Sequence, residues 1–191
     1  MPPKMSPLEA AFAGLWLMLP ALIPNPAAVL VGGGTPMDLG RTWGGRRVLG
    51  DGKTWRGFIG GATCGVLFGI LQIGVGQAAK LGDSWTFGEW PSALAIVLCL
   101  SFGSMMGDSL GSFVKRRIGV DRGFKAPGLD QYNFVVGAVV LLMIFRFDWF
   151  DQHYFTGDAI WGLVALLVIV PLLHRGINII GYKMGKKNVP W

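Results

Sequence analysis

Three polar side chains near the middle of the chain are spaced so that they could act together on a phosphate. In the stretch SFGSMMGDSLGSFVKRR, Asp108, Ser112 and Lys115 follow one another at intervals of four and three residues. On an α-helix these intervals place all three on one face, with Asp108 about two turns inside the end of an apolar segment. A carboxylate at that depth in a membrane costs roughly 3 kcal/mol unless it meets a cation or water. Asp108 is therefore a candidate functional residue, and a structural ion pair with Lys115 or a neighbouring helix is the alternative.

A second carboxylate, Asp130, stands just before the next apolar stretch, so folding could return it to the membrane depth of Asp108. Two acids that converge among many cations are typical of a magnesium–phosphate site, in which the acids hold the metal and Lys and Arg bind phosphate oxygens. Without such a metal, Asp121 and Asp130 would be solvated loop charges. The spacing alone leaves both interpretations open.

The loop GGGTPMDLGRTWGGRRVLGDGKTWRG is rich in glycine and basic residues. Its run Gly-Asp-Gly-Lys-Thr resembles the end of a Walker A loop, but Arg47 stands where that pattern needs its first glycine, which excludes a P-loop. Glycines still let backbone amides approach anionic oxygens. The candidate phosphate-binding side chains are Arg46, Lys53, Thr54 and Arg56. Because Asp38 and Asp51 lie among the cations, we favour a folded anion site over a flexible loop attracted to anionic lipid.

The chain offers no recognisable nucleophilic triad, because its only histidines, His153 and His174, do not pair with Ser or Cys in a known pattern. A phosphate monoester that attacks a nucleoside triphosphate is already an anion and needs no protein base. Arg175, just past the expected kink at Pro171, could contact a lipid headgroup or could simply snorkel to the interface.

The segments that must position these residues have the composition of membrane spans. Of the 191 residues, 52% are hydrophobic and 15% are charged. The net charge of +6 is concentrated in a few short loops, which does not indicate nucleic-acid binding. A span needs about 20 helical residues, or somewhat fewer for a short span. Five stretches qualify, at about 8–31, 58–79, 91–114, 132–147 and 157–182. We predict a single all-α polytopic membrane domain over residues 1–191.

The basic residues gather between alternate spans, which predicts the orientation. They are Arg41, Arg46, Arg47, Lys53 and Arg56 in loop 32–57, Lys115, Arg116, Arg117, Arg122 and Lys125 in loop 115–131, and Lys183, Lys186 and Lys187 at the C-terminus. Of the other basic side chains, Lys4, Lys80 and Arg146 fall on the opposite side. The positive-inside rule then places the N-terminus outside, and both loops and the C-terminus in the cytoplasm.

Glycines repeat every four residues in two of the expected spans. They are Gly61, Gly65 and Gly69 in one span and Gly103, Gly107 and Gly111 in the next. Such stripes let helix backbones approach closely in lipid. The sequence leaves open whether the neighbour is in the same chain or in a second copy, so a homodimer is one of two arrangements.

Three short motifs carry a family resemblance. They are Gly107-Asp108, then Ser112 to Arg116, then Pro127 to Asp130. Together they resemble the signature of the CTP-dependent phosphatidate cytidylyltransferases. At Asp121-Arg122 and from Lys125 to Gly128 the chain departs from the pattern of the bacterial members. It is similar there to the archaeal branch, the CDP-archaeol synthases. That similarity covers essentially the whole chain.

The resemblance implies transfer of a cytidylyl group from CTP to 2,3-bis-O-(geranylgeranyl)-sn-glycerol 1-phosphate, with release of pyrophosphate at the cytoplasmic face of the cell membrane. It implies Mg²⁺ held by Asp108 and Asp130. We expect Lys53, Thr54 and Arg56 to hold CTP phosphates, and Asp38 and Asp51 to order the loop or reach the ribose. Lys115, Arg116 and Lys125 would neutralise the leaving pyrophosphate or the attacking lipid phosphate. The alternative from another class is a small transporter or channel for a phosphorylated solute. In that case the basic side chains would attract the solute to the entrance of its path.

Overall fold

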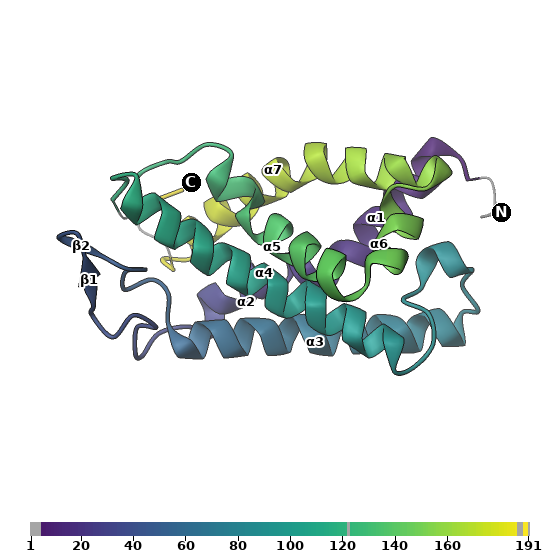
Figure 1. Ribbon diagram of the computed structural model, residues 1–191, viewed down its shortest axis with the longest axis horizontal. Coiled ribbons are helices and arrows are strands. Elements are labelled where there is room, and N and C mark those ends of the chain that lie inside the picture. The colour runs from purple at the N-terminus through teal and green to yellow at the C-terminus, as the bar shows by residue number, and fades with distance from the viewer. Residues whose placement is uncertain (1–4, 122, 187–188, 191) are drawn as a thin grey trace.

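The computed structural model describes residues 5–121, 123–186 and 189–190, so Lys4, Arg122 and Lys187 of the charge argument lie outside the described residues. Long helices run side by side along the longest axis, and a small hairpin projects beyond them at one end (Figure 1). The helices are α1 (Pro7–Leu22), α2 (Pro24–Val31), α3 (Trp55–Ala78), α4 (Ser92–Arg117), α5 (Leu129–Phe145), α6 (Phe147–Tyr154) and α7 (Ile160–Lys183). The strands are β1 (Thr42–Trp43) and β2 (Arg46–Arg47), and the 3-10 turns are η1 (Asp83–Trp85) and η2 (Gly157–Ala159).

Several of these helices are apolar enough for a membrane. Within the part of the chain that the structure describes, four segments have the length and composition to cross one: Pro7–Val31, Trp55–Ala78, Ser92–Arg117 and Gly157–Lys183. Helix α5 is apolar but has only 17 residues. All five segments coincide with predicted spans, and the structure is that of a mostly helical, multi-pass membrane protein. The number of crossings stays a prediction.

The second basic loop is shorter than the predicted 115–131. Helix α4 continues to Arg117, because Lys115, Arg116 and Arg117 in its last turn interact favourably with the negative end of the helix dipole. Helix α5 begins at Leu129, so Asp130 lies in its first turn rather than before it. An acid is favourable in the first turn because that end of the helix dipole is positive.

The first basic loop departs slightly from the all-α prediction, because β1 and β2 pair as an antiparallel hairpin. Its two-residue turn is Gly44-Gly45, with φ of 59° and 75°. Both values are positive, as a type I′ hairpin turn requires, and glycine adopts them without strain. The loop also ends earlier than predicted, because Thr54 caps α3 by accepting a hydrogen bond from the Gly57 amide (3.1 Å).

Prolines in α1 and α2 release backbone carbonyl groups that other helices then satisfy. Pro20 has no N–H, so the Trp16 carbonyl loses its helical partner, and the Gln72 side chain donates to it instead (2.8 Å). Pro24 frees the Pro20 carbonyl in the same way, and the Ser101 hydroxyl donates to it (3.1 Å). Inside a membrane no water can take this role, so these bonds fix α1 against α3 and α4.

Helix α7 is held to α5 by the same device. Pro171 leaves the Leu167 carbonyl without its helical donor, and the Tyr132 hydroxyl of α5 donates to it (2.6 Å). The position of α7 beside α5 is therefore set by a hydrogen bond as well as by packing.

Both glycine stripes pack within this one chain. In α4, a Cβ added at Gly107 would lie 2.8 Å from the Gly137 Cα of α5, and one at Gly103 would lie 2.7 Å from the Ala138 Cα. In α3, a Cβ at Gly65 would lie 2.6 Å from the Pro20 carbonyl oxygen. The stripes thus give no reason to invoke a second copy.

We expect Gly107→Ala to destabilise the protein by about 1–3 kcal/mol, because its methyl group would force α4 and α5 apart. Gly74→Ala in α3 is the matched control, since nothing lies within 4 Å of its added Cβ. Thermal unfolding of both variants in one detergent measures the difference. A Gly107→Ala protein that melts at or above the wild-type temperature would contradict the backbone contact.

Candidate active site

One large cavity contains both predicted metal ligands. It has a volume of about 730 Å³, and its lining residues come from α1 to α5, α7 and the two basic loops. Asp108, Asp130, Lys53 and Lys115 all face it. Other walls are apolar, with lining residues that include Leu22, Val29, Met105, Phe134, Val170 and Leu173. The cavity can therefore receive a ligand that has a charged part and a hydrocarbon part.

Two lysine–aspartate ion pairs connect three separate segments inside this cavity. Lys53, from the first basic loop, pairs with Asp108 of α4. Lys115 of α4 pairs with Asp130 of α5 through Nζ and Oδ1, 2.7 Å apart. The other Asp130 oxygen accepts the Ala126 amide (2.7 Å). The structural ion pair considered for Asp108 is thus made with the first basic loop, and not with Lys115.

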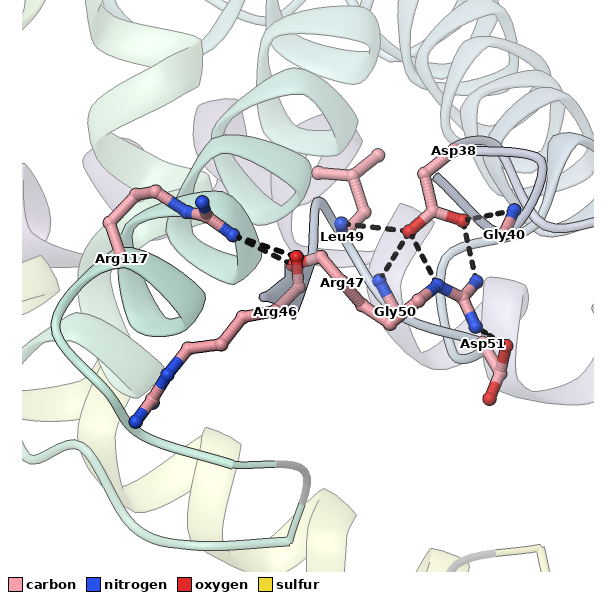
Figure 2. Close-up of polar contacts among 8 residues, drawn as sticks. All are labelled: Asp38, Gly40, Arg46, Arg47, Leu49, Gly50, Asp51 and Arg117. Carbon is pink, nitrogen blue, oxygen red and sulfur yellow. Dashed lines mark hydrogen bonds and ion pairs between the residues drawn. The ribbon is translucent and has the colours of Figure 1, made fainter. Parts of the chain in front are cut away.

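The loop that delivers Lys53 is organised around Asp38, whose side chain is only 1% exposed (Figure 2). Arg47 pairs with one carboxylate oxygen through Nη2 at 2.6 Å and donates to the other through Nε. Three backbone amides also donate to the carboxylate, those of Gly40, Leu49 and Gly50. The Arg47 hydrogen bond, aided by these amides, holds the Asp38 pKa far below its usual range, although burial acts in the opposite direction.

Arg117 fastens the hairpin to α4. Its guanidinium donates to the carbonyl oxygens of Trp43, Arg46 (3.3 Å) and Arg47 (3.0 Å), the last two drawn in Figure 2. The same group lies over the Trp43 and Phe113 rings, 5.3 and 5.5 Å from their centroids. In the sequence analysis Arg117 was only one of the basic residues of the second loop. The signal that could have predicted the hairpin, which Arg117 anchors, was the Gly44-Gly45 pair.

A second pocket of about 160 Å³ adjoins the charged part of the cavity. Lys53 and Lys115 line both spaces, and Ser112 and Arg116 line only the smaller one. Arg116 also donates to the Val120 carbonyl (2.6 Å). The two lysines therefore stand between two separate volumes, as cations that neutralise two adjoining phosphate groups would.

Of the remaining predicted residues, Thr54 and Asp51 line the larger cavity, and Asp51 also pairs with Arg47 (2.5 Å). Five others line neither space. They are Asp38, which is buried in the loop, and Arg46, Arg56, Lys125 and Arg175, which are exposed. Arg175 points outward because it lies on the far side of α7 from the cavity.

The sequence analysis assigned no site role to six polar residues that line the larger cavity. They are Lys186, Asn25, Ser109, Asn133, His174 and Asn178. Only the last two gave a usable signal, because a polar pair spaced by four residues in an apolar helix marks one face.

The donor set at the cavity fits Mg²⁺. Among the described residues no three His, Cys, Asp or Glu side chains gather as a metal-binding group. Mg²⁺ does not need such a cage, because it takes one or two carboxylates and completes its shell with water and substrate phosphates. Asp108 and Asp130, which both line the cavity, would supply those two carboxylates.

The chain matches known proteins over nearly all of its length. The family model described as CarS-like CDP-archaeol synthase matches residues 8–191. The CDP-archaeol synthase of Methanocorpusculum labreanum is 46% identical, with 91% of this chain and all of that protein covered. That of Thermococcus gammatolerans is 43% identical, with 98% and 100% covered. A solved structure, described as an intramembrane enzyme for archaeal membrane lipid biosynthesis, is 35% identical with a TM-score of 0.64, covering 91% of this chain and 95% of that chain.

We expect Asp38→Asn to loosen the first basic loop at neutral pH, since the amide cannot keep the charge-assisted bonds to Arg47. Hydrogen exchange of the Leu49 and Gly50 amides should accelerate at least tenfold, while Asp83→Asn, at the other end of the bundle, leaves it unchanged. Because folding lowers the Asp38 pKa, its contribution is present above pH of about 4 and is lost only at lower pH. Wild-type protection should therefore persist from pH 7 to about 4. Unchanged exchange in Asp38→Asn would contradict this role.

Proposed function

Since this chain belongs to the CDP-archaeol synthase family of archaeal lipid cytidylyltransferases, we propose that it transfers the cytidylyl group of CTP to 2,3-bis-O-(geranylgeranyl)-sn-glycerol 1-phosphate. The observation that carries the proposal is the cavity in which two carboxylates and two lysines stand beside apolar walls. A polyanionic nucleotide suits the charged part, and an isoprenoid lipid suits the rest.

In the proposed reaction an oxygen of the lipid phosphate attacks the α-phosphorus of CTP. A new phosphoanhydride bond forms, the bond to the β-phosphate breaks, and pyrophosphate leaves with its electrons. The attacking oxygen is already anionic at neutral pH, so the residues need to position and neutralise charge rather than remove a proton. This agrees with a cavity that holds lysines and carboxylates.

We assign Asp108 and Asp130 to Mg²⁺, which when bound would neutralise phosphate charge and align the reacting groups. Lys53 and Lys115 line both spaces, so their ammonium groups can reach oxygens of both substrates. Arg116 and Ser112, in the smaller pocket, are placed to bind one end of the nucleotide phosphates. Asp38 acts at a distance, by holding the loop that presents Lys53.

We further propose five membrane crossings with the N-terminus outside and the cavity open toward the cytoplasm. Both basic loops would then face the compartment that contains CTP, in agreement with the positive-inside rule. The apolar walls from α2, α5 and α7 would admit the lipid from the inner leaflet.

We expect purified wild-type protein to release pyrophosphate only when CTP, Mg²⁺ and the ether-lipid phosphate are all present. Asp108→Asn should lower turnover at least a hundredfold, because it removes a metal-binding charge and leaves Lys53 without its partner. Asp148→Asn, in α6 at the opposite end, is the matched control and should retain wild-type turnover.

Near-normal turnover in Asp108→Asn would remove the metal assignment. Comparison of CTP with ATP, GTP and UTP tests the nucleotide, and equal rates with all four would contradict cytidylyl transfer. The transporter alternative predicts flux of a phosphorylated solute into sealed vesicles without nucleotide consumption, and that result would replace the enzyme assignment.

A further inference from the structure

A polar pair on α7 lies in an otherwise apolar wall of the larger cavity. The Asn178 amide nitrogen is 3.3 Å from each ring nitrogen of His174, one turn away. Both residues line the cavity, together with Val170, Leu173 and Ile177 of the same helix. Asn178 is only 3% exposed. The two side chains thus form one hydrogen-bonded polar unit beside these three aliphatic residues.

A polar unit in this position needs hydrogen-bond partners. Burying a carboxamide costs about 1–3 kcal/mol unless its hydrogen bonds are replaced, and the contact with His174 replaces part of them. Aliphatic side chains would fill the same helix face at lower cost, as they do one turn before it. Polar residues inside a membrane segment are retained mostly where they meet a substrate or its path.

The fold fixes this pair relative to the carboxylates. Tyr132, two residues after Asp130 in α5, donates to the Leu167 carbonyl that Pro171 leaves free in α7. The helix that carries Asp130 therefore also holds α7 just before His174. The polar pair and the charged part therefore belong to two walls of the same cavity.

We infer that His174 and Asn178 bind the glycerol phosphate head of the lipid substrate, an inference that rests on the proposed function. An ether-linked glycerol phosphate presents ether and phosphate oxygens, which accept hydrogen bonds from imidazole and carboxamide N–H groups. Neighbouring Val170, Leu173 and Ile177 contact the start of its hydrocarbon chains. The triphosphate of the nucleotide needs cations, and Lys53 and Lys115, which line both spaces, supply them.

Kinetics with a short-chain 2,3-dialkyl-sn-glycerol 1-phosphate test this assignment in the full-length protein. His174→Leu and Asn178→Leu should each raise the KM for the lipid about tenfold or more, with the KM for CTP within twofold of wild type. His174→Gln, which keeps a hydrogen-bonding side chain, should recover most of the lipid affinity. Leu172→Ala, on the exposed face of α7, is the matched control and should behave as wild type.

Equilibrium binding of the same lipid phosphate without CTP or Mg²⁺ gives a second measurement, independent of turnover. Both Leu variants should bind it about tenfold more weakly. Equal KM changes for both substrates, or a lower melting temperature with unchanged KM values and binding, would show a structural role only and overturn the inference. If the wild type released no pyrophosphate, the proposed function would be wrong. The lipid-binding measurement would still show whether His174 and Asn178 bind the lipid phosphate.

Discussion

The contact between the backbones of α4 and α5, where Gly107 faces Gly137, is the constraint on which the cavity depends. Helices in lipid gain little from apolar burial against one another, so close packing of small residues must hold them together. This contact sets α4 beside the first turn of α5, and so brings Asp108 and Asp130 to one cavity. Any side chain larger than hydrogen at Gly107 would separate the two helices and with them the two acids.

Two ion pairs occupy the charged part of the cavity. Each carboxylate meets a lysine, and in both pairs each side chain is about a fifth exposed. An ion pair of this kind gains little net stability, because desolvation offsets much of the attraction. Its importance lies in position: Lys53 ties the first basic loop to α4, and Lys115 ties α4 to α5. The same four charges can instead bind a cation and a polyanion together, which an apolar core could not do.

Much of this could be predicted from the sequence because it depends on local pattern. Hydropathy located the helices, the spacing of glycines located the helix contact, and acids in unusual surroundings identified Asp108 and Asp130. Their ion-pair partners could not be predicted, since Asp108 has Lys115 nearby on its own helix and the path of the loop decides that Lys53 reaches it. The outward direction of Arg175 and the inward direction of His174 depend on the rotation of α7, which the Tyr132 hydrogen bond sets from another helix.

Metal binding tests most directly whether Asp108 and Asp130 act as one site. Mn²⁺ can replace Mg²⁺ as a spectroscopic probe, and its binding to the purified protein can be followed by electron paramagnetic resonance as CTP is added. In the wild type we expect one population of protein-bound Mn²⁺, which appears when CTP is added. In Asp130→Asn its affinity should be about tenfold or more weaker. Mn²⁺ binding of wild-type affinity in Asp130→Asn would contradict a site shared by the two carboxylates.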